Sequence, residues 1–453
     1  MNPLVLSALP LAASGVMCIL GRRRWPVLLV AAVTLTLCAA MIWRWVAMED
    51  RSTLFGLEWV LDTATRSLLV RIYAGTLVLF ACAQLRQNVP AFSAAALASV
   101  GVLTAALLAR PLWLASLLLS CGVVLTAGVA RPQKASAARG ASGLLLWSSL
   151  PIPFVLALFA LLEHHALYPD DAQAVNLAGL LSIVPMVLWL NLFPVQATVR
   201  AWAADGVPLG PVLAWVVRDA VVLFWALGLW QQHPELCTPT ALDLLGLVGL
   251  LTAVASGILA GVRRSPGSLL ACAMACQLGT AVSGAVAGSV NGWEGVLALL
   301  AGRWIAAWLA VAALTVLDDR CSPAGDGQIS RTTNWPQWAA VAGYSIAILS
   351  LAGALPGPGF CGRQQVYLAL GEGFMALRVP WALASLGLVV GLARLLPSLL
   401  AIKSHGQGQV RVRPSLFLLC ALLLLSGYVA LRPLQILSWI PVALHPLPLG
   451  LVR

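Results

Sequence analysis

The chain has 453 residues, of which 60% are hydrophobic and only 9% are charged, and its mean hydropathy is +0.92. Soluble domains carry roughly 25% charged residues, so the composition excludes a soluble domain and predicts an all-α polytopic membrane protein. The net charge of +11 does not indicate nucleic-acid binding, because the bases lie in loops between apolar segments, where they set membrane topology.

Apolar runs of the length that crosses a bilayer, about 20 residues, follow one another with short loops between them. We expect about fourteen transmembrane helices in one integral membrane domain, residues 1–453. The spans are predicted at about 3–20, 25–47, 67–86, 90–109, 111–130, 143–162, 175–198, 207–230, 241–262, 266–289, 292–316, 336–374, 378–402 and 414–437.

The loop charges predict the orientation of these spans. Loops after odd-numbered spans carry fifteen bases, and the opposite loops carry five. Because basic loops stay in the cytoplasm, we expect a multi-pass protein of the cell inner (plasma) membrane with both termini on the non-cytoplasmic side. The fifteen are Arg22, Arg23, Arg24, Arg86, Arg131, Lys134, Arg139, Arg200, Arg263, Arg264, Arg320, Arg331, Lys403, Arg411 and Arg413; the five are Arg51, Arg66, Arg110, Arg378 and Arg453.

The twelfth predicted span is interrupted. Two prolines and four glycines fall within the eleven residues 353–363, which end in the strong base Arg363. A membrane helix loses its regular hydrogen bonds only where protein or water replaces them. Broken helices with ionisable groups are typical of ion paths in transporters. The alternative is a plain kink with an arginine that reaches the interface. The predicted break residues are Pro356, Pro358 and Gly359.

This stretch also carries a resemblance. Leu351-Ala352-Gly353, Pro356 and Gly359-Phe360-Cys361-Gly362-Arg363 resemble a motif of the antiporter-like membrane subunits of respiratory complex I, Mrp-type cation/proton antiporters and membrane hydrogenases. The resemblance implies fourteen helices with two inverted five-helix repeats and breaks in helices 7 and 12. It also implies a proton-handling lysine at the last motif position, where this chain has Arg363.

Two further places carry the resemblance, which covers about residues 55–400. The joint between the ninth and tenth spans, 251–279, is similar to the family's pattern there. The stretch 189–196 resembles the family's seventh-helix break, which Pro194 supplies here. At that break Trp189 stands where the family has a lysine, and Ser120 stands where the fifth helix has its glutamate. Arg218 falls near a lysine position of the eighth helix.

Groups that exchange protons near neutral pH are scarce in the predicted spans. The two lysines, Lys134 and Lys403, lie in loops, and arginine stays protonated. Arg218 and Asp219 are adjacent, so they are expected to point about 100° apart and not to pair with each other. Arg363 and Glu372 are candidates for a shared polar axis across the break. The charged residues interpreted as lying inside the membrane, away from the span ends, are Arg71, Arg218, Asp219, Arg303, Arg363, Glu372 and Arg394.

Burial of these charges requires partners or water, which leaves structural ion pairing and a working ion path as alternatives. The candidate path residues are Arg218, Asp219, Arg303, Arg363 and Glu372.

No catalytic centre, metal site or cofactor is expected. The ten cysteines form no CxxC pair, and Cys272 and Cys276, one turn apart, are interpreted as small core residues. The expected partners are the lipid bilayer, other subunits of a membrane complex, and protons or small cations.

Three functions remain as hypotheses. The first is an antiporter-like, proton-conducting subunit of a complex of the complex I, Mrp or hydrogenase type; the resemblance also extends to inorganic-carbon uptake complexes. The second is a degenerate scaffold that keeps the fold without conducting. The third is an unrelated secondary permease with its own substrate cavity.

Overall fold

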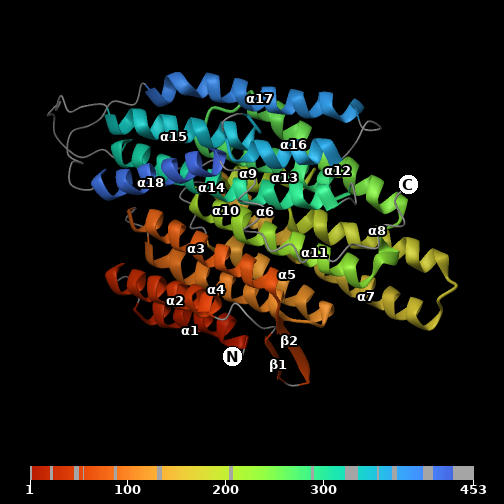
Figure 1. The fold of residues 1–453 in the computed structure, drawn as a ribbon. Coiled ribbons are helices and arrows are strands. Elements are labelled where there is room, and N and C mark those ends of the chain that lie inside the picture. Colours follow the sequence, from red (N-terminus) through yellow and green to blue (C-terminus); the bar gives the residue numbers. More distant parts are fainter. Residues whose placement is uncertain are drawn as a thin grey trace.

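A bundle of long helices makes up the structure, a computed structural model (Figure 1). It describes residues 3–20, 24–44, 50–54, 56–85, 89–129, 135–203, 208–286, 290–321, 335–354, 357–369, 375–400 and 412–431. In Figure 1 the colour passes from red on one side to blue on the other, so elements close in sequence are mostly neighbours.

The first half of the bundle contains two strands and eleven α-helices. They are α1 (Leu4–Leu20), α2 (Arg24–Arg44), β1 (Asp50–Leu54), β2 (Leu57–Leu61), α3 (Thr63–Leu85), α4 (Val89–Leu108), α5 (Leu112–Gly128), α6 (Ala135–Ser149), α7 (Pro151–Leu167), α8 (Ala172–Trp189), α9 (Gln196–Ala203), α10 (Leu209–Leu213) and α11 (Asp219–Gln232). A π-helical turn, Ala214–Arg218, joins α10 to α11.

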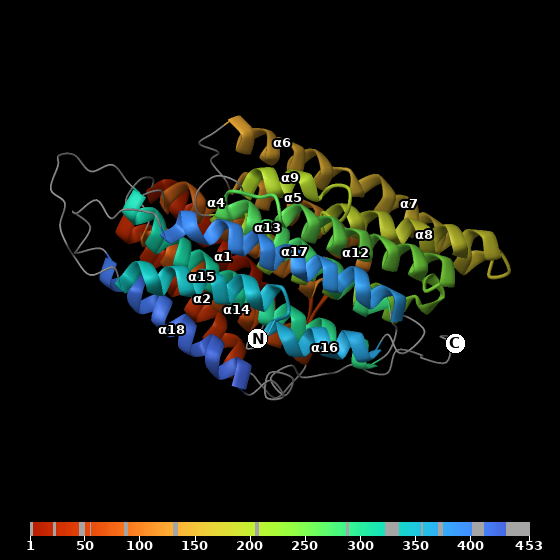
Figure 2. The same ribbon diagram turned by 90° about the horizontal axis from the view of Figure 1, so that it is seen from above.

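The second half follows a short 3-10 turn, Pro234–Leu236. Its helices are α12 (Pro239–Ala260), α13 (Pro266–Val286), α14 (Val290–Cys321), α15 (Trp335–Leu351), α16 (Gly359–Ala369), α17 (Met375–Leu400) and α18 (Val412–Leu431). Seen from above, α17 lies along α12 on the outside of the bundle (Figure 2).

Eight segments of the described chain are long and apolar enough to cross a membrane. They are Thr63–Ala83, Ser142–Leu167, Ala172–Trp189, Leu209–Gln232, Pro239–Ala260, Pro266–Val286, Gly292–Leu317 and Val379–Leu400. Five shorter apolar helices accompany them: Leu4–Leu20, Pro26–Ile42, Phe92–Leu108, Leu112–Gly128 and Leu416–Val429. The prediction of an all-helical membrane protein is therefore confirmed for the described residues, with one β-hairpin as the exception.

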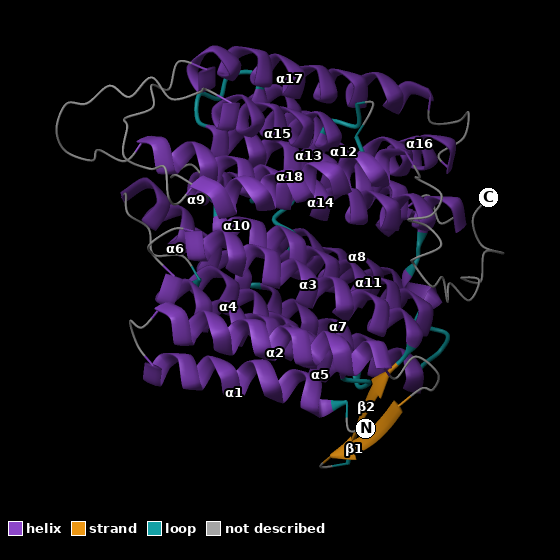
Figure 3. Cartoon of the chain, turned by 60° about the vertical axis from the view of Figure 1, so that its left-hand side comes forward, coloured by secondary structure: helices purple, strands orange, loops and turns teal. Residues whose placement is uncertain are grey.

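Strands β1 and β2 form that antiparallel hairpin, which projects from one end of the bundle (Figure 3). Gly56 between the strands has φ +75, a conformation that glycine adopts without steric cost. The hairpin packs on the bundle because the Arg110 N–H donates to the Glu58 carbonyl at 3.0 Å. The sequence analysis missed it, since two five-residue strands give little hydrophobic periodicity.

Helix α8 stops inside the bundle at a compact two-bond cap. Asn191 takes φ 50, and its N–H donates to the Leu188 carbonyl at 3.2 Å. The next N–H, that of Leu192, donates to the Val187 carbonyl at 2.9 Å. This pair of bonds is the Schellman motif, in which a left-handed residue ends the helix and satisfies its last carbonyls. Pro194 follows after a cis peptide bond, and α9 begins at Gln196.

Helix α15 ends in the same way. Gly353 takes φ +73 and donates to the Ser350 carbonyl at 3.0 Å, while Ala354 donates to the Leu349 carbonyl at 2.9 Å. The N–H of Gly359, the first residue of α16, donates to Ser350 Oγ at 3.2 Å. Protein groups thus replace helical hydrogen bonds between α15 and α16. Pro356 and Glu372 lie outside the described residues.

Candidate functional site

Three charged side chains meet in the middle of the bundle. The Asp219 carboxylate, fully buried at the start of α11, accepts from Arg218 Nη2 with Oδ1 and from Arg303 Nη2 with Oδ2, each at 2.7 Å. Arg218 Nε adds a second bond to Oδ1 at 3.0 Å. Arg218 and Arg303 are 0% and 1% exposed. Two guanidiniums and one carboxylate give this triad one net positive charge.

The expectation that Arg218 and Asp219 do not pair with each other is wrong. It considered only the roughly 100° between consecutive side chains on an ideal helix. Arg218 is the last residue of the π-helical turn, where the backbone departs from that spacing, and its long side chain reaches the neighbouring carboxylate. Asp219 contacts both arginines because Oδ1 accepts from Arg218 and Oδ2 accepts from Arg303 of α14.

Helix α14, which carries Arg303, also contacts the break between α15 and α16. Gly302, the neighbour of Arg303, lies against the loop, since a Cβ there would stand 2.9 Å from the Pro358 carbonyl oxygen. A side chain at Gly362 of α16 would likewise stand 2.5 Å from the Leu299 nitrogen. Close approach of α14 and α16 therefore depends on small residues, as in other membrane helix pairs.

Arg363 lies in the first turns of α16, directly after this break, and is 5% exposed. Its Nη1 donates to the Ala352 carbonyl at the end of α15, its Nη2 to the Trp381 carbonyl at 3.3 Å, and its Nε to Tyr367 Oη at 2.9 Å. A cation at a helix C-terminus is favoured by the helix dipole. The described partners of Arg363 thus include two carbonyls, a phenol and the Cys276 thiol, and the proposed companion Glu372 lies outside the described residues.

Trp189 and Ser120, which the sequence resemblance matches to a lysine and a glutamate of the family, lie in an uncharged cluster. Trp189 is fully buried, and its ring meets the ring of Trp225 edge-on with centroids 5.1 Å apart. Trp225 Nε1 donates to Ser116 Oγ at 2.9 Å. Ser120, one turn further along α5, donates to the Ser116 carbonyl. These four described side chains contribute no charge at this place.

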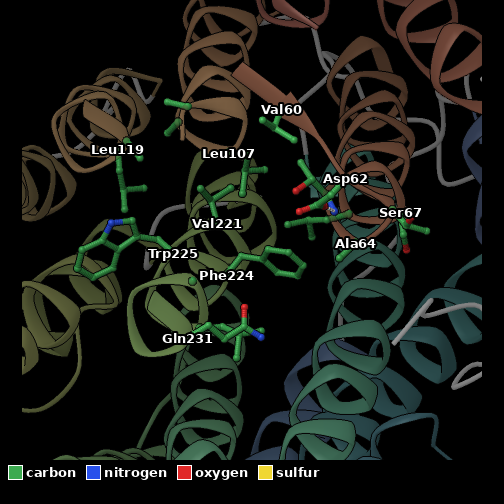
Figure 4. Close-up of a pocket in the computed structure, with 18 of the residues that line it drawn as sticks. Val60, Asp62, Ala64, Ser67, Leu107, Leu119, Val221, Phe224, Trp225 and Gln231 are labelled. Carbon is green, nitrogen blue, oxygen red and sulfur yellow. Dashed lines mark hydrogen bonds between the residues drawn. The ribbon is translucent and has the colours of Figure 1, made fainter. Parts of the chain in front are cut away.

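A cavity of about 390 Å³ lies between α3, α4, α5, α11 and α14, at the end of the bundle that carries the hairpin (Figure 4). Asp62, Arg71 and Gln231 are among its polar lining residues. Trp225 and Trp304 also line it. Trp304 adjoins Arg303, and Trp225 lies six residues, or about 9 Å of helix rise, from Asp219. The cavity thus ends within two helical turns of the triad.

A second cavity, of about 10 Å³, lies on another side of Arg303. Asn191 at the end of α8, Arg200 of α9 and Trp215 of the π-helical turn line it together with α13. Nε and Nη1 of Arg303, Nε and Nη1 of Arg200, and Asn191 Oδ1 have no hydrogen-bond partner among the described residues.

The remaining ionisable residues inside the predicted spans occupy different surroundings. Arg71 lines the large cavity. Arg394 is exposed, and it donates to the Gly261 carbonyl at the end of α12, at 2.8 Å. Cys272 and Cys276 are buried in α13, within interaction distance of Arg200 and Arg363 respectively. Of the predicted path residues, the structure brings together Arg218, Asp219 and Arg303.

Several polar residues of this region were not singled out from the sequence. Gln277 of α13 donates to the Leu299 carbonyl of α14 at 3.3 Å. Ser256 of α12 donates to Gln196 Oε1 at the start of α9. Gln277 lies in the stretch 251–279 that carries the sequence resemblance. The only signal of Ser256 is a polar side chain inside an apolar span, which serine shares with many structural positions.

The comparisons with known proteins agree with this architecture. No family model matches the chain, and no curated protein matches it. A chain of respiratory complex I from Thermus thermophilus is similar with a TM-score of 0.70 and 18% identity, over 97% of this chain and 99% of that chain. A chain of the Mrp complex from Dietzia sp. DQ12-45-1b is similar with a TM-score of 0.77 and 17% identity, over 97% of this chain and 96% of that chain.

A third similar structure is the membrane-bound sulfane sulfur reductase, an archaeal respiratory membrane complex. Its TM-score is 0.79 at 13% identity, over 97% of this chain and 96% of that chain. The chain has the fold of antiporter-like membrane subunits. The likeness extends beyond residues 55–400, where the sequence resemblance lies, and at these identities it shows the antiporter-like fold alone.

Proposed function

We propose that the chain is an antiporter-like membrane subunit of a larger complex and that it takes part in proton or cation/proton translocation. The observation that carries the proposal is the buried triad Arg218–Asp219–Arg303, with two tryptophans of the large cavity within two turns of it. A buried carboxylate near an aqueous cavity is a group through which a proton can pass. Asp219 takes up a proton when one of its arginine contacts opens.

The proposed arrangement is one integral membrane domain of fourteen spans with two inverted five-helix repeats, in the inner membrane, with both termini non-cytoplasmic. The caps at Asn191 and Gly353 support equivalent breaks in the seventh and twelfth spans. In this orientation the large cavity opens on the non-cytoplasmic side. The ion path then leads from the cavity to Asp219 and on toward Arg363, with Glu372 as a further member.

A non-conducting scaffold is the second candidate. It is favoured by the uncharged cluster of Trp189, Trp225, Ser116 and Ser120, where the family has a lysine and a glutamate. It is also favoured by Arg363, whose described hydrogen bonds tie α16 to α15 and α17. Both candidates use the same fold and differ in whether charge moves.

The test is proton flux through vesicles that contain the purified complex. A potassium gradient with valinomycin sets the membrane potential, and a dye inside the vesicles reports pH. Flux above that of vesicles whose complex lacks this chain supports translocation; equal flux supports the scaffold. The subunits that purify with the chain distinguish a respiratory, an Mrp-type and an inorganic-carbon uptake complex.

A further inference from the structure

We propose that the small cavity between α8, α9, α13 and Arg303 binds one monovalent anion of chloride size. The proposal rests on the charges and unpartnered donors around this space. It holds whether or not the chain conducts protons.

The first argument is the charge of the buried triad. Arg218, Asp219 and Arg303 are each at most 1% exposed, and together they carry one net positive charge. An uncompensated charge inside a membrane protein costs at least about 2.5–3.5 kcal/mol even on the gentlest insertion scale. A bound anion next to Arg303 neutralises this excess.

The second argument is the number of free donors on the two arginines that line the cavity. Nη2 of Arg303 is occupied by Asp219, whereas its Nε and Nη1 have no hydrogen-bond partner among the described residues. Arg200 presents the same two nitrogens without partners, and both arginines line the cavity. Buried polar groups are nearly always hydrogen-bonded in native proteins, so these donors indicate an occupant that accepts.

The third argument is the chemistry of the walls. None of the described residues that line the cavity is acidic. Its volume of about 10 Å³ is at the lower limit for one water molecule, so an anion here is monatomic and its entry moves the flanking side chains slightly apart. Asn191 Oδ1 is the one unpartnered side-chain oxygen among the described lining residues, and Asn191 Nδ2 donates to the Trp189 carbonyl at 3.3 Å. Four guanidinium donors and no carboxylate favour an anion over a cation.

The site also has an entrance and a structural role. Arg200 is only partly buried, so an anion can reach the cavity along its side chain. Asn191 belongs to the cap that ends α8, Arg200 to α9, and Arg303 to α14. An anion between them ties both sides of the seventh-span break to the triad, and its loss loosens all three elements.

The experiment measures thermal unfolding of the full chain, purified in its complex. Sodium chloride, sodium bromide and sodium gluconate are compared at equal sodium concentration and ionic strength. Chloride and bromide should raise the Tm saturably, and gluconate should not. Arg200→Gln should move the chloride midpoint at least about tenfold higher, which corresponds to about 1.4 kcal/mol. Arg303→Gln should abolish the chloride-dependent rise, and Arg394→Gln, which alters an exposed arginine, should leave it unchanged.

Bromide gives a direct readout that does not depend on any variant folding. Crystals grown in bromide should show an anomalous scattering peak between Arg303 and Arg200. Equal Tm values in chloride and gluconate, a chloride midpoint unaffected by Arg200→Gln, or density without a bromide signal would each assign the cavity to water and overturn the proposal.

Discussion

Asp219 and Arg303 lie 84 residues apart in the chain and meet at 2.7 Å, with both side chains fully buried. This contact joins α11 to α14, and Arg218 completes it from the adjacent position. The triad contains two positive charges and one negative charge. The loss of stability on substitution therefore depends on the net charge that remains buried.

We expect Asp219→Asn to lower the yield and the Tm of the assembled complex more than Arg218→Gln does. The first change leaves two buried guanidiniums facing each other, and the second leaves a neutral pair of Asp219 and Arg303. Breaking a buried pair typically costs about 3–5 kcal/mol, because the partner is stranded. Yield by size-exclusion chromatography and Tm measure both effects.

Glu58→Gln is the control for that series. It breaks an exposed ion pair with Arg51, in which the side chains are 64% and 45% exposed. Exposed pairs contribute about 0–1 kcal/mol, so yield should stay at the wild-type level. A wild-type yield for Asp219→Asn, or a larger loss for Arg218→Gln, contradicts the charge argument.

Arg363→Ala should reduce assembled complex, because it removes the donor from two buried carbonyls and from Tyr367. Arg363→Lys keeps a cation at the end of α15, so assembly should stay nearly intact while proton flux changes. Tyr367→Phe is the control: it removes one hydrogen bond, worth about 0.5–1.5 kcal/mol. Normal yield and normal flux in Arg363→Ala would remove this residue from both roles.

The sequence predicted the helical segments and both breaks for local reasons. Apolar runs predict membrane-spanning helices, and proline and glycine indicate where these helices end. It did not predict which residue ends each helix, because the two-bond caps at Asn191 and Gly353 depend on backbone conformation. Pro194 and Gly359 lie next to those caps, so composition located the breaks to within a few residues.

The triad could be predicted only in part. Arg218, Asp219 and Arg303 were recognised as buried charges, because charged residues are rare in apolar spans. Their meeting point could not be read from the sequence, since a contact across 84 residues depends on how helices pack. Periodicity even gave the wrong answer for Arg218 and Asp219, because it contains no information on a π-helical turn.

Gly353→Ala should destabilise the chain through the cap of α15. A residue other than glycine costs roughly 1–2 kcal/mol at φ +73, and the new Cβ would also clash with Cδ of Arg363. Thermal unfolding measures the cost. Gly15→Ala in α1 is the control, because its Cβ meets nothing within 4 Å, and it should be neutral or stabilising. Equal Tm values for the two variants would contradict the role of the cap.

Reporter fusions test the orientation. Fusions at Lys134 and Lys403, both outside the described residues, should report the cytoplasm, because the basic loops follow odd-numbered spans. A fusion in the hairpin at Gly56 should report the opposite side. A non-cytoplasmic signal at either lysine contradicts the proposed topology, and it would also place the large cavity on the cytoplasmic side.

Gly228→Leu tests the large cavity as an access route. Gly228 lines the cavity, and a Cβ there meets nothing within 4 Å, so leucine fills space without disturbing the helix packing. Yield should be normal, and proton flux per complex should fall. Gly15→Leu, on an exposed face of α1, should change neither. Unaltered flux in Gly228→Leu would mean that protons take another route.

The most direct test of translocation through Asp219 is proton flux in vesicles for the double variant Arg218→Gln/Asp219→Asn. This variant removes the carboxylate and one guanidinium together, so Arg303 alone keeps the buried net charge at its wild-type value. Flux is normalised to the amount of assembled complex in each preparation. We predict clear potential-driven flux for the wild type and none above background for the double variant; equal flux in the two would contradict a path through Asp219.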